Sequence, residues 1–249
     1  MSEESREARL SAAFVRLTES LTADYDVIDL MNVLLEESIT ILDTQAAGLL
    51  LADPSGTLQL VASTSEKVNL VEIMQLNAGE GPCLDCFTTG VAVTMGDIEH
   101  DGQKWPKFRE AAVREGFRSV HATPMRSRGQ VIGSLNLLST TVGRLNSRDI
   151  AVAQALTDVA TIGLLHERLA SESSIVTGQL QYALDTRIYI EQAKGVLAEQ
   201  LKIEMDEAFI ALRDYARGNN ITLRTVAEGV TSRSIVISAA ASSPARHTT

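Results

Sequence analysis

The hydrophobic pattern changes its period after residue 45, and this change constrains the fold more than any other feature. Residues 46–52 and 57–63 form two short apolar runs separated by Asp53-Pro54-Ser55-Gly56. Two strand-like runs around such a turn sequence predict a β-hairpin. Further strands fit residues 91–94, 119–125 and 131–138, the last two joined at Arg128-Gly129. We therefore expect an antiparallel sheet.

Helical patterns flank these strands. Apolar residues at helical spacing predict one helix over residues 8–43 and another near 66–75. A third helix is expected from about Ser147, which is a plausible N-cap. Strands with helices inserted between them, without strict alternation, are typical of an α+β domain with helices on one face of an antiparallel sheet.

Length and composition bound the class of protein. The 249 residues, 45% of them hydrophobic, suffice for two domains. No apolar run is long enough to span a bilayer, and the first ten residues lack the basic and apolar parts of a signal peptide, so we expect a cytoplasmic protein with no membrane association. The net charge of −10 lies in residues 1–176, which carry 14 basic and 24 acidic side chains. Residues 177–236 are near neutral, with 7 basic and 8 acidic, so only this part is expected to bind polyanions.

A seven-residue repeat crosses from the first part of the chain into the second. Its apolar positions are Ile162, Leu169, Val176, Ala183, Ile190 and Leu197. Such a repeat is typical of a coiled coil, and it predicts a homodimer formed through the 162–197 helix. The alternative is two separate amphipathic helices whose phases agree by chance.

Three amphipathic helices are expected near the C-terminus, over residues 177–201, 205–217 and 223–231. Thr222 is a good N-cap for the last of them, whereas Glu204 is a weaker cap for the second. Residues after Thr231 show no periodicity, and residues 235–249 are expected to form a mobile tail, although the apolar segment Ile235-Val236-Ile237 could pack locally.

The first of these helices carries the block Arg187-Ile188-Tyr189-Ile190-Glu191-Gln192-Ala193-Lys194-Gly195-Val196-Leu197. Arg187 and Lys194 are two turns apart on one face, which suits contact with phosphates. Gly195 is costly inside a helix and suggests that another helix or an RNA backbone approaches closely. Gln192 could read a base edge and Tyr189 could stack on a base. The alternative is that the charges are ordinary solvated ones.

This block, followed by Asp206-Glu207-Ala208-Phe209, Leu212-Arg213 and Thr225-Val226-Ala227, resembles the ANTAR module, an all-α three-helix RNA-binding domain of transcription antitermination regulators. The resemblance implies binding to paired hairpins with six-nucleotide loops in a nascent transcript, which prevents a terminator stem from forming. The implied RNA-binding residues are Arg187, Tyr189, Gln192, Lys194, Gly195, Arg213 and Arg217.

Residues 10–168 resemble a GAF domain, through Gly79-Glu80-Gly81-Pro82-Cys83, Trp105-Pro106 and the hairpin that contains Val131-Ile132-Gly133-Ser134-Leu135-Asn136. GAF-like domains commonly sense small molecules, so a ligand of unknown identity remains open, and no cofactor is expected. Pocket candidates, each of which could instead be simple core, are Met74, Cys83, Phe87, Trp105, Phe108 and Met125. Cys83 and Cys86 form a C-x-x-C, which is either structural or a thiol redox pair. No metal site is expected, because a closed zinc site needs four ligands.

Enzyme signatures such as a phosphate-binding loop, a nucleophile elbow or a kinase catalytic loop are absent from the sequence, so no enzyme activity is expected. We expect a GAF-like sensor domain over residues 1–168, a helical linker over 169–179, an ANTAR domain over 180–234 and a tail over 235–249. The predicted function is a signal-responsive RNA-binding antiterminator. The rival hypothesis is a ligand-binding sensor whose C-terminal helices dock a protein partner.

Overall fold

A computed structural model describes residues 3–19, 26–53, 55–127, 129–166 and 175–238. The chain divides into two compact units, Met1–Leu184 and Asp185–Thr249, and each is described by itself. None of the helices in the described ranges combines the length and apolar character that a membrane span requires.

A five-stranded antiparallel sheet forms the centre of the first unit, as the hairpin pattern predicted. The strands are β1 (Ala46–Ala52), β2 (Leu58–Ser63), β3 (Val93–Met95), β4 (Ser119–Ser127) and β5 (Gln130–Ser139). Their order across the sheet is β2-β1-β5-β4-β3. The two hairpins, β1–β2 and β4–β5, are joined through β1 and β5, so residues distant in sequence pair at the centre of the sheet.

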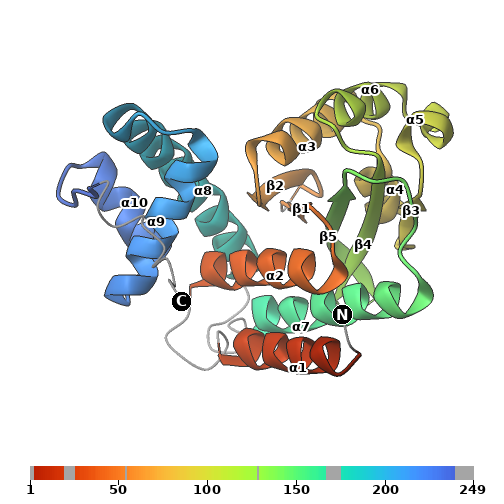
Figure 1. Ribbon diagram of the computed structural model, residues 1–249, viewed down its shortest axis with the longest axis horizontal. Helices are drawn as coiled ribbons and strands as arrows, with labels where there is room; N and C mark the ends of the chain where they lie inside the picture. The colour runs from red at the N-terminus through yellow and green to blue at the C-terminus, as the bar shows by residue number, and fades with distance from the viewer. Residues whose placement is uncertain (1–2, 20–25, 54, 128, 167–174, 239–249) are drawn as a thin grey trace, which may run out of the picture. The chain divides into compact units, whose positions relative to one another are not determined.

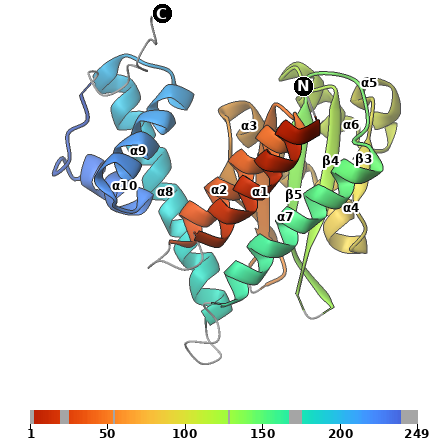
Figure 2. The same ribbon diagram turned by 60° about the horizontal axis from the view of Figure 1, so that its bottom comes forward.

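Helices cover both faces of this sheet, which corrects the expectation that they lie on one face (Figure 1, Figure 2). On one face lie α1 (Glu3–Glu19), α2 (Val27–Leu42) and α7 (Ser147–His166). On the other lie α3 (Glu66–Ala78), α4 (Pro82–Thr89), α5 (Ile98–Asp101), the 3-10 helix η1 (Gly102–Lys104) and α6 (Pro106–Arg114). The physical reason is visible in the strands. Six successive residues of β1 are buried, so both of its faces need cover.

The helix expected over residues 8–43 is in fact two helices, α1 and α2. Asp26 begins α2 as its N-cap, and its carboxylate accepts a hydrogen bond from the Ile28 N–H at 2.8 Å. α7 starts at the predicted place, but its cap is Asn146, whose side-chain oxygen accepts from the Asp149 N–H at 2.9 Å. Local side-chain hydrogen bonds decide such boundaries, and periodicity alone does not show them.

The glycine-rich segment between α3 and α4 turns the chain sharply. Gly79 ends α3 in the left-handed conformation with φ 69°, which a residue without Cβ adopts at little cost. Pro82 occupies the first turn of α4, where a missing N–H removes no helical hydrogen bond. The turn places Cys83 and Cys86 against the sheet, where both are buried.

Three helices occupy the C-terminal part of the described chain, as predicted: α8 (Ile175–Leu201), α9 (Met205–Asn219) and α10 (Leu223–Thr231). Thr222 caps α10 as expected, its hydroxyl accepting from the Thr225 N–H at 3.1 Å. α9 starts firmly despite Glu204, because Glu207 accepts a hydrogen bond from the Glu204 N–H at 3.2 Å.

Part of the predicted tail packs against α10. Ile237 is 3% exposed, and the side chain of Ile235 lies where a Cβ on Gly229 would be. Val236 is 77% exposed. The remainder of the predicted tail, residues 239–249, lies outside the described residues.

The predicted seven-residue seam is only partly available to a second chain. Ala183, Ile190 and Leu197 are already buried within a single chain, and only Ile162 is exposed, at 60%. Leu169 lies outside the described residues, as does the segment that would join α7 to α8, and the side-chain burial of Val176 is not described. The seam therefore does not continue along α8 through Ile190 and Leu197, because both side chains are already buried within one chain.

Candidate RNA-binding surface and sensor cavity

The exposed residues of α8 are not the ones that the sequence analysis predicted from Arg187 and Lys194. Ile188, Gln192 and Gly195 are exposed, and their spacing places them on one side of the helix. A Cβ added to Gly195 would meet no atom within 4 Å, so no described helix approaches it. Of the two interpretations of this glycine, another helix or an RNA backbone, the described helices of the chain do not supply the first, and the surface beside it is open to an external molecule.

Lys194 lies on the inner side of α8 and does not join Arg187 on an exposed face. Its side chain is 7% exposed, and its Nζ lies 2.9 Å from Oε2 of Glu191, one turn earlier. The same Nζ lies 5.9 Å from the centre of the Phe209 ring on α9. The sequence pattern could not show this, because a lysine reads as exposed until the packing of a second helix over its aliphatic stem is known.

Phe209 is flanked by two cations. The guanidinium of Arg213, one turn further along α9, lies 5.9 Å from the same ring. Burial lowers the pKa of Arg213, and the neighbouring charge of Arg217 adds to this effect. Arg217 itself is exposed. Arg217 therefore offers a charge to solvent, while Arg213 and Lys194 hold theirs against an aromatic ring.

Tyr189 also has a cation over its ring. The guanidinium of Arg224 on α10 lies 5.5 Å from the ring centre, and its Nε donates to Glu228 at 2.7 Å. Its Nη1 donates to the Thr186 hydroxyl on α8 at 3.1 Å. Tyr189 and Arg187 are both half-buried. This contact network fixes α10 against α8 and presents only part of the Tyr189 ring for stacking.

In the first unit, most of the residues expected to line a pocket are packed as core. Trp105 and Phe108 belong to one apolar cluster, with ring centres 6.4 Å apart in an edge-to-face arrangement. Cys83 belongs to a second cluster, against which Phe87 packs. Met125 is also buried, at 1% exposure, while Met74 is 37% exposed on α3. None of the six lines the cavity described below.

A buried polar network, which sequence reasoning missed, occupies the space between α3 and the sheet. Glu72 is 1% exposed, and its carboxylate accepts hydrogen bonds from Asn136 Nδ2 at 2.8 Å and from Gln75. Ser134 donates to Asn136 at 2.9 Å. Burial raises the pKa of Glu72 to about 7. The sequence does contain a signal for this burial, because the spacing of Glu72 from Val68 and Gln75 places all three on the same face of the helix.

The two thiols adjoin this network. Burial raises the pKa of Cys83 well above its ordinary value, with the nearby Glu72 charge adding to it, and burial raises the pKa of Cys86 to about 11. Thiols that remain protonated are poor nucleophiles. Among the described residues no group of three or more His, Cys, Asp or Glu side chains is placed to hold a metal ion.

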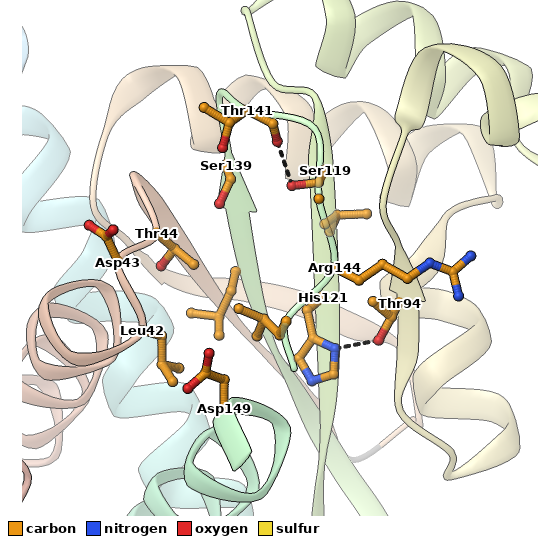
Figure 3. Close-up of a pocket in the computed structure, with 14 residues that line it drawn as sticks. Leu42, Asp43, Thr44, Thr94, Ser119, His121, Ser139, Thr141, Arg144 and Asp149 are labelled. Atoms are coloured by element: carbon orange, nitrogen blue, oxygen red, sulfur yellow. Dashed lines mark hydrogen bonds between the residues drawn. The ribbon is translucent and has the colours of Figure 1, made fainter. Parts of the chain in front are cut away.

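A cavity of about 260 Å³ lies on the other face of the sheet, between the end of α2, strands β4 and β5, and the first turn of α7 (Figure 3). Among its lining residues are Leu42, Thr44, His121, Leu137, Ser139 and Asp149. His121 is hydrogen-bonded through Nδ1 to the Thr94 hydroxyl at 2.6 Å, and burial lowers its pKa to about 4. Its imidazole is therefore uncharged at neutral pH.

Family comparisons agree with the two-unit architecture. The GAF domain model matches residues 24–164, more than half of the chain, and the ANTAR domain model matches residues 178–230. The chain belongs to the GAF-ANTAR family. Its ANTAR domain makes it an RNA-binding antitermination regulator, and its GAF domain is of the sensor type.

Solved structures similar to the chain support the GAF fold alone. The GAF domain of a phosphoenolpyruvate-protein phosphotransferase from Coxiella burnetii is 14% identical, with 66% of this chain and 96% of that chain covered and a TM-score of 0.51. Free methionine-R-sulfoxide reductase from Neisseria meningitidis is 16% identical, with 69% and 96% covered and a TM-score of 0.51. A comparison with curated proteins gave no match.

Proposed function

We propose that this regulator binds hairpin loops in nascent RNA through its ANTAR domain and that a signal received by the GAF domain controls this binding. The observation that carries the proposal is the exposed stripe of α8 within the matched ANTAR segment, where Gln192 and the open surface at Gly195 lie side by side. An exposed amide can hydrogen-bond an unpaired base, and a residue without a side chain admits a backbone closely.

The charge for phosphate contact comes foremost from Arg217 in this proposal. It is exposed, whereas Lys194 is covered by α9 and bound to Glu191. Three half-buried side chains remain predicted RNA contacts, and we expect each to contribute less than Arg217: Arg187, Tyr189 and Arg213. Lys194 acts in the proposal by holding α8 against Phe209, so the proposed recognition surface is displaced from the Arg187–Lys194 face toward Gln192 and Gly195.

A homodimer would present two ANTAR domains to two linked hairpins, which raises affinity without any new contact. Four side chains of α7 support this part of the proposal: Val152, Ala155 and Val159 are half-buried and Ile162 is exposed. Their 3-4-3 spacing is that of a coiled-coil seam. The proposed seam therefore lies on the last helix of the GAF domain, and the linker of residues 169–179 would separate it from the ANTAR domain.

Binding to an RNA with two six-nucleotide hairpin loops, compared with a loop-scrambled RNA at several salt concentrations, tests the proposal. We expect Gln192→Ala to reduce discrimination between the two RNAs, and Arg217→Ala to weaken binding to both and lower the salt slope by about one. Lys202→Ala is the matched control, because Lys202 is an exposed cation that is not among the proposed RNA contacts. Ile162→Glu should remove the advantage of two linked hairpins over one.

Equal binding of the native chain to the intact and scrambled loops would refute hairpin recognition. It would favour the rival hypothesis, in which the C-terminal helices dock a protein partner. An effect of Lys202→Ala as large as that of Arg217→Ala would instead show that binding is non-specific attraction to positive charge.

A further inference from the structure

The cavity on the α2 and α7 face of the GAF domain has the features of a ligand site. Its volume of about 260 Å³ is below the range of roughly 300–1,000 Å³ that holds drug-sized ligands, so an occupant would be smaller than those ligands. It is bounded by the end of α2, strands β3, β4 and β5, the loop that follows β5, and the start of α7. A ligand bound there would contact several separate parts of the chain.

The lining carries two carboxylates, Asp43 and Asp149, and one guanidinium, Arg144. Figure 3 shows the Asp149 carboxylate directed into the cavity, whereas the Arg144 side chain extends past Thr94 and away from it. His121 is uncharged at neutral pH because its pKa is lowered to about 4. Asp149 is held in place by Asn146, whose Nδ2 donates to Oδ2 at 2.7 Å, and a carboxylate can accept several further hydrogen bonds. A positively charged donor is the complementary ligand.

Thr44 provides an independent observation. The residue is 9% exposed, its hydroxyl has no hydrogen-bond partner among the described residues, and it lines the cavity (Figure 3). Buried hydroxyl groups in folded proteins are nearly always hydrogen-bonded, since an unsatisfied one costs free energy. A ligand with N–H groups would satisfy it.

Three leucines lie among the polar lining residues, which include Ser119, Ser139 and Thr141. They are Leu42, Leu137 and Leu145, and they cannot hydrogen-bond a hydrated ion through their side chains. A cation that carries a short hydrocarbon chain could place that chain against these leucines. The combination of the Asp149 carboxylate, the unsatisfied Thr44 hydroxyl and the three leucines therefore selects against bare metal ions, anions and neutral hydrocarbons.

We propose that this cavity binds a small primary ammonium compound, with Asp149 as counter-ion, Thr44 as hydrogen-bond acceptor and the three leucines packed against its hydrocarbon chain. The proposal rests on the proposed sensor function only where it makes this ligand an input signal. Binding itself is measured without RNA, so failure of this site and failure of RNA recognition give different results.

The test is titration of the ¹⁵N-labelled full chain with n-butylammonium chloride, with 1-butanol and sodium butyrate as neutral and anionic counterparts of similar shape. We expect saturable shifts of the amide signals of Thr44, His121 and Asp149 with butylammonium alone. Asp149→Asn should weaken binding about tenfold or more. Asp158→Asn, which makes the same change on the exposed side of α7, should leave it unaltered.

Thr44→Val should weaken butylammonium binding while keeping the shape of the side chain. If Asp149→Asn fails to fold, the Thr44→Val variant tests the proposal in its place. Three results would overturn the proposal. They are equal responses to butanol and butylammonium, unchanged affinity in folded Asp149→Asn or in Thr44→Val, and no saturable shift up to about 10 mM butylammonium.

Discussion

Glu72 and His121 should have opposite effects on the stability of the GAF domain over nearly the same pH range. The pKa of Glu72 is raised from 4.5 to about 7, and that of His121 is lowered from 6.5 to about 4, in both cases chiefly by burial. They lie on opposite faces of the sheet, since Glu72 contacts Asn136 whereas His121 lines the α7-side cavity. We therefore expect their contributions to add independently.

The sign differs between the two groups. Folded Glu72 holds its proton longer than the unfolded chain does, so its contribution is fully present below pH 4.5 and is lost as pH rises to about 7. Folded His121 resists protonation, so its contribution is present above pH 6.5 and is lost as pH falls to about 4. Each difference of 2.5 pH units, at 1.36 kcal/mol per unit, corresponds to about 3 kcal/mol. The two contributions nearly cancel in the native protein.

Urea unfolding followed through Trp105 fluorescence measures this effect, because the only tryptophan of the chain is buried in the GAF domain core. From pH 4 to 7, the free energy of unfolding of Glu72→Gln should rise by about 3 kcal/mol relative to the native chain, because the His121 contribution is then unopposed. For His121→Asn, which can retain a hydrogen bond to Thr94, it should fall by about 3 kcal/mol relative to the native chain.

Comparison with the native chain at each pH removes the contributions of all other groups. A difference between Glu72→Gln and the native chain that does not change from pH 4 to 7 would refute the raised pKa of Glu72. A difference of the same sign in both variants would refute the reasoning that burial acts oppositely on an acid and a base.

Three further predictions concern other positions. Lys194→Glu should destabilise the ANTAR domain by about 3 kcal/mol, because it places a second carboxylate beside Glu191 in a covered site. Lys194→Met should destabilise it much less. Equal decreases in the melting temperature of the two variants, measured by circular dichroism, would contradict this prediction. Gly195→Ala should stabilise α8 by up to about 1 kcal/mol and weaken RNA binding, and unaltered RNA affinity would exclude close backbone contact there. Cys83 and Cys86 should react with iodoacetamide only on unfolding, and rapid labelling of the native protein would restore the redox hypothesis.

Local features of the sequence determined most of the secondary structure. The Asp53–Gly56 turn, the Thr222 cap and the apolar periods gave the hairpins and the three C-terminal helices, because each depends on residues a few positions apart. The ordered residues of the α8 block likewise indicated the ANTAR domain, because a family pattern is a property of the chain itself. Local signals did not reveal the two caps at Asp26 and Asn146, which set where α2 and α7 begin.

Tertiary structure alone decided which side chains are inside. Lys194 is covered by Phe209 of another helix, and Glu72 is buried because β5 brings Asn136 to it from 64 positions away. The cavity gathers Thr44, His121 and Asp149 from three distant segments, so no spacing in the sequence foretold it. Burial depends on what packs from elsewhere in the chain, and an amino-acid pattern describes only what one segment offers.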